Sequence, residues 1–273
     1  MILWAESNAF DRPRHNLKEA LKRAYVRPFA AAHVYGRSNL EYLVRLRFPE
    51  DRIFTGRALA DTAHFRPLPR LHPRPSHKTL LYVGRLAPEK NLDRLLTALA
   101  QIRQDPASPR IVLRLVGYGP LERELRGLAA RLSISPFVDF CGPASQEALP
   151  AIYSAADAIV LPSLSEPWGL VVNEAMSCGL PALVSSRCGC ALDLVNPQTG
   201  WLFDPADTRQ LTAALEEFAD APLTLLSTMG TAARELARRY SVDPCADTVI
   251  DSIRAATHSP AADVPAPSCL APQ

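Results

Sequence analysis

The sequence predicts an α/β fold: one complete, doubly wound parallel sheet, preceded by part of a second α/β domain. From residue 78 to residue 240, apolar strand-like runs alternate regularly with helix-like segments. This alternation is typical of a parallel sheet with helices on both faces. The first 65 residues show the same alternation less clearly. The length of 273 residues fits one large domain or two smaller domains of roughly 150 residues each.

Residues 1–75 are predicted to be the remnant of one domain together with a linker. Strands are expected at 2–5, 31–35 and 52–55, and helices at 16–32 and 39–47. In the first helix, apolar residues recur near every 3.6 positions, with lysine and arginine between them. Pro28 is expected to kink or end the first part of this helix. Four prolines between residues 67 and 75 mark the linker.

Residues 76–240 are predicted to form the complete sheet domain. Its strands are expected at 79–83, 111–116, 138–140, 158–161, 182–184 and 200–203, and its helices at 91–102, 121–132, 146–155, 168–178, 207–219 and 224–240. A C-terminal helix is assigned to residues 241–257, with Asp243 as its cap and Pro244 in its first position. Residues 258–273 are rich in proline, alanine and serine, which predicts a disordered tail.

Charge is distributed unevenly along the chain. Residues 1–75 carry 14 Lys or Arg against 7 Asp or Glu, a net charge of +7, which leaves 2 − 7 = −5 for the remainder. The basic segment 12–27 could therefore contact an anionic membrane or an anionic substrate. A solvated basic helix is the alternative, and both interpretations stay open. No nucleic-acid partner is expected.

Several classes of protein are excluded by composition. No apolar run approaches the roughly 20 residues that a membrane-spanning helix needs. The apolar start, residues 1–5, is too short for the core of a signal peptide. The six cysteines are expected to be reduced thiols. The expected location is cytoplasmic, either free or peripheral to the inner face of the membrane.

The strongest chemical signal is the segment 163–181, which reads Ser-Leu-Ser-Glu-Pro-Trp-Gly-Leu-Val-Val-Asn-Glu-Ala-Met-Ser-Cys-Gly-Leu-Pro. It lies between two predicted strands. Glu166 is expected in the loop at the carboxyl end of the first strand, with Pro167 at the first helical position and Glu174 about one turn into the helix. Open α/β sheets bind ligands at this edge. Because ionised carboxylates only accept hydrogen bonds, the pair is suited to gripping neighbouring hydroxyls, as on a ribose and on a sugar ring.

This segment resembles the Glu-x7-Glu signature of retaining, GT-B-fold glycosyltransferases of family 4. The match continues past Glu174 through Ala-Met-Ser-Cys-Gly-Leu-Pro. The resemblance covers residues 78–240 well and residues 1–65 more weakly. It implies that residues 76–240 are the Rossmann-like domain that binds a nucleotide sugar, and that the chain lacks the beginning of the N-terminal, acceptor-side domain. The family often shows Asn-Gly-Val-Asp before the linker, whereas residues 58–61 here are Ala-Leu-Ala-Asp.

The turn after the first strand of the complete sheet is a candidate diphosphate site. Gly84 and Arg85 follow this strand, and Lys90 opens the next helix. A diphosphate needs positive charge and backbone donors, and a helix N-terminus supplies both dipole and amides. The resemblance implies that Gly84, Arg85 and Lys90 bind the donor diphosphate and offset the charge of the two glutamates. A surface arginine and lysine in an ordinary turn are the alternative.

Glycines near the motif are expected to shape the backbone. Gly169 and Leu170 lie between the two glutamates, and their backbone amides could donate to the donor sugar or phosphate. A purely packing role for them stays open. The glycines of Gly117-Tyr-Gly-Pro120 are read as tight-turn residues, and Asp193 and Asn196 as cap or turn residues. No metal site and no bound cofactor are expected.

The resemblance implies transfer of a hexosyl group from a UDP- or GDP-sugar to an acceptor hydroxyl on a lipid-linked or polysaccharide intermediate, with retention. Glu166 would hold the donor sugar and Glu174 the ribose, while Arg85 and Lys90 would stabilise the departing diphosphate. The catalytic candidates are therefore Glu166, Arg85 and Lys90. Two alternatives stay open. One is an inactive nucleotide-sugar-binding remnant, or one half of a split transferase. The other is a non-transferase relative such as an epimerase or phosphorylase.

Overall fold

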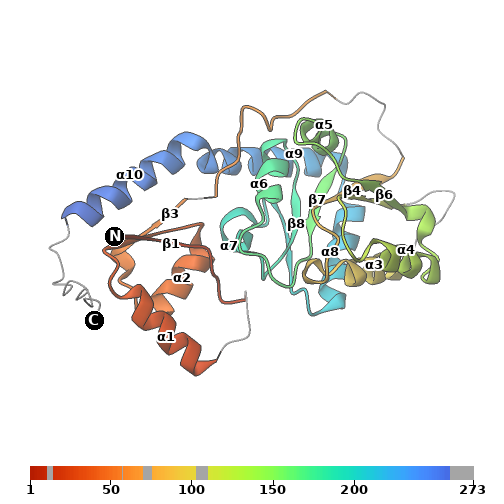
Figure 1. The fold of residues 1–273 in the computed structure, drawn as a ribbon. Helices are drawn as coiled ribbons and strands as arrows, with labels where there is room; N and C mark the ends of the chain where they lie inside the picture. The colour runs from red at the N-terminus through yellow and green to blue at the C-terminus, as the bar shows by residue number, and fades with distance from the viewer. Residues whose placement is uncertain (11–14, 57, 70–75, 103–109, 259–273) are drawn as a thin grey trace.

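The computed structural model describes residues 1–10, 15–56, 58–69, 76–102 and 110–258 (Figure 1). Its strands form two separate sheets, one of three strands and one of six. Some predictions fall outside the described residues: nearly all of the tail 258–273, residues 12–14 of the basic segment, and residues 70–75 of the linker.

The first sheet has the strand order β1-β2-β3, formed by Ile2–Ala5, Ala31–Val34 and Ile53–Thr55, and all pairs are parallel. Its connections are α1 (Asn16–Val26), α2 (Arg37–Arg45) and the 3-10 turn η1 (Glu50–Arg52). Figure 1 shows α1 and α2 below the strands and α10 above them. The helix predicted at 16–32 ends at Val26, just before Pro28, since proline cannot continue the helical hydrogen bonding.

Helix α1 presents most of its apolar residues to solvent, although Val26 at its end is buried. The side chains of Leu17, Leu21 and Tyr25 are 63–75% exposed, although their 3.6-residue spacing is what predicts the helix. The opposite side of the helix faces α2, where the Tyr42 hydroxyl lies 3.1 Å from the Glu19 carboxylate and 2.8 Å from Lys22 Nζ. The apolar stripe of α1 is thus on the outer surface of this unit.

The second sheet has the order β6-β5-β4-β7-β8-β9, and all of its pairs are parallel. In chain order the strands are β4 (Lys78–Val83), β5 (Ile111–Val116), β6 (Val138–Gly142), β7 (Ala158–Leu161), β8 (Ala182–Ser185) and β9 (Gly200–Phe203). After β6 the chain returns to the other side of β4, so the strand order reverses between β4 and β7. The carboxyl ends of these two strands form the switch point at which such sheets bind ligands.

Helices cover this sheet on both faces: α3 (Leu92–Gln101), α4 (Glu122–Arg131), α5 (Leu149–Ser154), α6 (Leu170–Ser177), α7 (Ala191–Leu194), α8 (Thr208–Asp220) and α9 (Leu223–Ala237), with 3-10 turns η2 (Pro88–Lys90), η3 (Ser135–Phe137) and η4 (Arg238–Tyr240). Two predicted helix starts in this domain are wrong, and in the first domain α2 begins at Arg37 rather than at residue 39. Helix α5 begins at Leu149 rather than 146, and α6 begins at Leu170 rather than 168. Pro167 is therefore not a first helical residue; Gly169, at φ +109°, precedes the helix instead.

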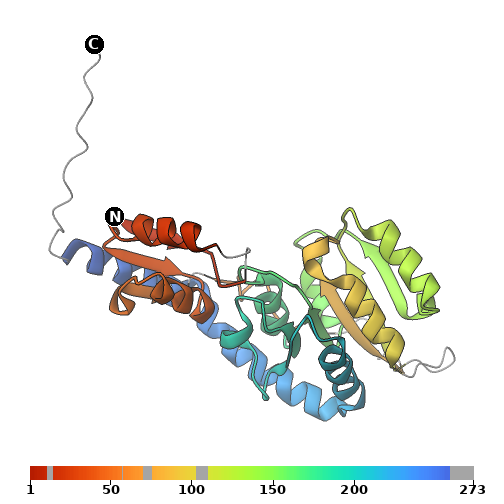
Figure 2. The ribbon, with the colours of Figure 1, turned by 90° about the horizontal axis from the view of Figure 1, so that it is seen from below.

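The last helix, α10 (Val242–His258), returns to the first sheet. His33 Nε2 on β2 lies 3.0 Å from Thr248 Oγ1 on α10, and Figures 1 and 2 show this helix running along the first strands. The helix begins one residue before Asp243, so Asp243 and Pro244 lie in its first turn and not at the predicted cap positions. The segment after β3 contacts the chain just before α10: the Ala60 amide donates to the Tyr240 carbonyl at 3.0 Å. In the part of the chain that the structure describes, no helix could cross a membrane.

Candidate functional site

The switch point brings Glu166 and Lys90 together. Glu166 lies in the loop after β7, and Lys90 ends the 3-10 turn that follows β4. Their side chains form an ion pair, and each is only about one-sixth exposed, at 16% and 17%. The Ser163 hydroxyl lies 3.5 Å from the same carboxylate oxygen. Because the pair is largely shielded from water, the attraction between its charges is stronger than in an exposed pair.

Backbone hydrogen bonds fix the loop that carries Glu166. The carbonyl of Glu166 accepts from the Gly189 amide at 2.9 Å and from Asn8 Nδ2 at 3.0 Å. The Leu164 amide donates to the Glu89 carbonyl at 2.8 Å, which ties the loop to the turn after β4. The position of Glu166 is therefore set from three parts of the chain.

The turn after β4 lies beside a cavity of about 260 Å³, whose lining includes Gly84, Arg85 and Gly117. Gly84 has φ +150° and Gly117 has φ +141°, a region that favours glycine. A Cβ atom on Gly117 would lie 1.9 Å from the Gly84 carbonyl oxygen, so the close approach of the two turns requires glycine at position 117. The Tyr82 hydroxyl donates to the Arg85 carbonyl at 2.8 Å, which fixes the backbone of the turn. Arg85 is exposed and lines the cavity.

Glu174 is held separately from Glu166. It lies on α6, and its carboxylate accepts a hydrogen bond of 2.7 Å from the Tyr153 hydroxyl. Burial raises the pKa of the Glu174 carboxyl above its usual value; the Tyr153 hydrogen bond and the nearby His64 partly offset this shift in pKa. The two glutamates thus differ in environment: one is paired with a cation and the other with a hydroxyl.

The start of α6 shapes the space between the two glutamates. A Cβ atom on Gly169 would lie 2.6 Å from a methyl carbon of Leu161, so a side chain would not fit there. Leu170, the first residue of the helix, is exposed. Trp168 is buried, and its indole N–H donates to Asn173 Oδ1 at 2.7 Å. The amides of residues 169–171 are therefore at a helix N-terminus, where they can donate to an anionic or polar ligand.

Trp168 lies at a junction between the two sheets. Its ring stacks on Tyr35, with ring centroids 6.0 Å apart, and contacts Tyr240. The carboxylate of Asp193 accepts from the Arg37 amide at 3.0 Å and from the Tyr240 hydroxyl at 3.3 Å. Burial raises the pKa of Asp193. Asp193 was expected to be a cap or turn residue; its contacts show that it also joins the first sheet to the second.

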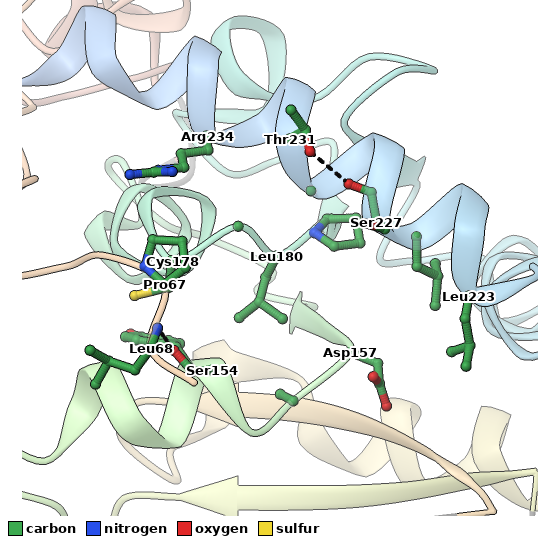
Figure 3. Close-up of a pocket in the computed structure, with 16 residues that line it drawn as sticks. Pro67, Leu68, Ser154, Asp157, Cys178, Leu180, Leu223, Ser227, Thr231 and Arg234 are labelled. Atoms are coloured by element: carbon green, nitrogen blue, oxygen red, sulfur yellow. Dashed lines mark hydrogen bonds between the residues drawn. The ribbon is translucent and has the colours of Figure 1, made fainter. Parts of the chain in front are cut away.

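A second cavity, of about 320 Å³, opens at the opposite edge of the large sheet. Figure 3 shows Leu180 in its middle, Arg234 and Thr231 of α9 above, and Asp157 and Ser154 below. Asp157 directly precedes β7, so this cavity lies at the amino ends of the strands, away from Glu166. Burial and the nearby Glu174 raise the pKa of the Cys178 thiol in its wall to about 12, so this thiol is protonated at neutral pH.

No group of three or more His, Cys, Asp and Glu side chains with a geometry for a metal ion occurs among the described residues. The structure places Glu166, Lys90, Gly84 and Arg85 at adjoining strand ends, and Glu174, Gly169 and Leu170 on or beside α6. The roles assigned to these seven residues stay predictions. The partners Asn8, Asp193 and Tyr153 were missed as site residues, because no local pattern marks a contact between distant segments.

The comparison with known families settles where the chain belongs. The model of the family described as glycosyl transferases group 1 matches residues 69–236, which is more than half of the chain. The chain belongs to this family. The predicted resemblance to glycosyltransferases is thereby confirmed, and the matched region contains both the Lys90 turn and the Glu166 segment.

Relatives of this chain within the family include a D-inositol 3-phosphate glycosyltransferase of Rhodococcus opacus. The two are 35% identical over 211 residues, which is 72% of this chain and 47% of the relative. A homologue from Streptomyces scabiei with the same name is 36% identical over 186 residues, or 65% of this chain and 41% of the relative. The chain thus spans about half the length of the curated relatives that it matches.

Solved glycosyltransferase structures share the fold. A sucrose-phosphate synthase from Thermosynechococcus elongatus superposes with a TM-score of 0.71 and 26% identity, covering 93% of this chain and 67% of that one. Anabaena HepE in complex with UDP and glucose superposes with a TM-score of 0.75 and 18% identity, covering 93% and 71%. The predicted α/β fold of GT-B type is therefore confirmed.

Proposed function

We propose that this chain carries the donor site of a retaining glycosyltransferase that moves a hexosyl group from a UDP- or GDP-sugar to an acceptor hydroxyl. The observation that carries the proposal is the shielded Lys90–Glu166 ion pair at the switch point, beside the turn of Gly84 and Arg85. A cation and a carboxylate side by side suit a ligand that has a diphosphate next to a polyhydroxylated ring.

Each proposed role follows from the chemistry of the group. When the bond between the anomeric carbon and the diphosphate oxygen breaks, negative charge grows on the diphosphate, and Arg85 and Lys90 stabilise it. The Glu166 carboxylate accepts hydrogen bonds from the sugar hydroxyls, and Glu174, oriented by Tyr153, accepts from the ribose. The acceptor oxygen then bonds to the anomeric carbon on the same face of the ring, its proton passes to the departing diphosphate oxygen, and UDP or GDP leaves. In this scheme the protein needs no bound cofactor.

Several similar proteins support the choice of ligands. The HepE structure contains UDP and glucose, and a structure of Staphylococcus aureus TarM contains UDP and α-GlcNAc-glycerol. The Rhodococcus relative is named for transfer to an inositol phosphate. We therefore favour a UDP-sugar as donor and a hydroxyl of a sugar, polyol or lipid-linked intermediate as acceptor.

The decisive experiment is isothermal titration of the purified chain with UDP, GDP, UDP-glucose and GDP-mannose, together with donor hydrolysis and transfer assays. We expect one nucleotide family to bind, and its sugar form to bind more tightly than the free nucleotide. A chain that binds none of the four would contradict the proposed donor site.

A second candidate function is nucleotide-sugar binding without transfer, or service as one half of a two-chain enzyme. It is favoured by one observation: the residues of the proposed donor site all lie on the second sheet and its connections, and nucleotide-sugar binding needs that part alone. The same titration separates the two candidates, because binding with transfer supports the enzyme and binding without hydrolysis or transfer supports the second candidate. Transfer also needs an acceptor held in place, whereas nucleotide-sugar binding does not.

We also propose that α1 contacts an anionic membrane surface, which keeps the protein on the cytoplasmic face. The exposed apolar stripe Leu17, Leu21 and Tyr25 lies on the same helix as Lys18 and Arg23, which are exposed too. An apolar face flanked by cations is typical of interfacial helices. Co-sedimentation with vesicles containing anionic lipid should exceed that with neutral vesicles and weaken as salt rises.

Leu21→Ser should reduce this co-sedimentation, whereas Leu225→Ser, at an exposed position of α9, should not. Equal binding to neutral and anionic vesicles, or equal effects of the two substitutions, would contradict the membrane contact.

A further inference from the structure

The segment that follows β1 reaches from the first sheet to the loop of Glu166. Asn8 is fully buried, and both the nitrogen and the oxygen of its side-chain amide form hydrogen bonds. Its Nδ2 donates to the Glu166 carbonyl at 3.0 Å, and its Oδ1 accepts from the Phe10 amide at 2.8 Å. The side chain is therefore held in one orientation, with its N–H group pointing at the backbone of Glu166. Glu166 is the residue that we propose binds the sugar of the nucleotide sugar.

A second buried amide supports the first. Asn39 at the start of α2 is also fully buried, and its Nδ2 donates to the carbonyls of Glu6 and Ser7 at 2.8 and 3.1 Å. Its Oδ1 accepts from the Gly36 amide at 3.3 Å. The two asparagine side chains thus form a chain of hydrogen bonds: Asn39 on α2 holds the segment 6–8, and Asn8 in that segment holds Glu166. A buried side chain with satisfied hydrogen bonds has little freedom to shift.

The Glu166 carbonyl receives its other hydrogen bond from the second sheet, through the Gly189 amide at 2.9 Å. On the side-chain end, the carboxylate is paired with Lys90. The backbone of Glu166 is therefore fixed by both sheets at once, and loss of the Asn8 bond would leave its carbonyl with the Gly189 hydrogen bond alone. Binding groups must be held to within about 0.5 Å of their working geometry, so such supporting contacts decide function.

We propose that Asn8 is a positioning residue: by holding the Glu166 backbone from the first sheet, it sets the carboxylate against the sugar ring of the donor. This inference rests on the proposed function. It predicts a specific effect, because Asn8 supports the group that binds the sugar and not the groups Arg85 and Lys90 that bind the diphosphate. The sugar part of the binding affinity should depend on Asn8, while the nucleotide part should not.

The test compares dissociation constants for UDP and UDP-glucose, or for GDP and GDP-mannose, according to which pair the wild-type chain binds. The ratio of the two constants reports how much the sugar adds to binding. In Asn8→Ala we expect this ratio to fall about fivefold, the size of one lost hydrogen bond. The constant for the free nucleotide should change less than about twofold. No catalytic turnover is needed for this measurement.

Three variants sharpen the test. Asn8→Asp keeps an oxygen for the Phe10 amide but cannot donate to Glu166, so it should behave like Asn8→Ala. Asn16→Ala, the same change at an exposed position of α1, should leave the ratio unchanged. In a Glu166→Gln background, Asn8→Ala should lower the ratio no further, because Asn8 acts through Glu166.

The outcomes separate this inference from the proposed function. If wild type gains affinity from the sugar and Asn8→Ala keeps that gain, the inference is wrong while the donor site stands. If Asn8→Ala weakens free nucleotide and nucleotide sugar equally and lowers the melting temperature, Asn8 is only structural, and the inference is again wrong. If the wild-type chain binds none of the four ligands, both the inference and the proposed function fail.

Discussion

Glu166→Gln should slow sugar transfer by roughly 100-fold or more, as removal of one well-placed electrostatic group does in other enzymes. Glutamine keeps the shape of the side chain but replaces the negatively charged carboxylate, whose oxygens accept hydrogen bonds from the sugar hydroxyls, with a neutral amide. The affinity for free UDP should stay the same or rise, because the Lys90 ammonium loses the carboxylate that now neutralises it. Transfer rates and UDP titrations on the same sample provide the measurement.

Glu89→Gln is a matched control for this substitution. Glu89 lies next to Lys90 in the same 3-10 turn, but its side chain is exposed and only its backbone contacts the Glu166 loop. The control should transfer sugar at close to the wild-type rate. If Glu166→Gln abolished UDP binding and left turnover per bound donor intact, the division of roles between Glu166 and the cations would be wrong.

The largest loss of stability is expected from Gly117→Ala. Alanine would have to adopt φ +141°, and its Cβ would lie 1.9 Å from the Gly84 carbonyl oxygen. Backbone strain and the clash together should lower the free energy of unfolding by about 3 kcal/mol or more. For a domain of about 150–250 residues, each kcal/mol lowers the melting temperature by roughly 2–4 °C. Thermal unfolding followed by circular dichroism would show a fall of at least about 6 °C.

Gly127→Ala is the corresponding control. Gly127 lies inside α4, and a Cβ atom there would meet only the end of Arg131, at 3.5 Å. Because alanine favours helices by up to about 1 kcal/mol over glycine, this variant should be as stable as wild type or slightly more so. Equal melting temperatures for Gly117→Ala and wild type would show that the two turns can move apart without cost.

The strands of the large sheet were predicted well from the sequence. Both faces of a parallel sheet are covered, so its strands are short, continuous apolar runs such as residues 158–161 and 182–184. Helix starts were harder. The proline at position 167 suggested a first helical residue, yet the left-handed backbone of Gly169 delays the helix to Leu170, and this conformation reflects the close approach to Leu161.

The candidate site was only partly predictable. The resemblance implied that Lys90 offsets the charge of the two glutamates, so its proximity to Glu166 was expected. The strand order that brings the two residues together was not predicted, because alternation of strands and helices does not fix it. Asn8 gave no local signal, since its role depends on a contact across 158 positions of sequence. The outward face of α1 was equally hidden, because a periodic apolar pattern shows that residues share a face but does not show which way that face points.

The backbone crosses between the two sheets twice, through the linker after β3 and again between η4 and α10, and the Ala60 amide joins the two crossings to each other. Two bodies tethered side by side in this way cannot slide apart as separate blocks. The freedom left to them is rotation about the line of the tethers, absorbed by a few backbone dihedrals there. Such a rotation would move the first sheet relative to the loop that carries Glu166. The hydrogen bonds of Asn8 and Asp193, which join the two sheets, would have to break during this rotation.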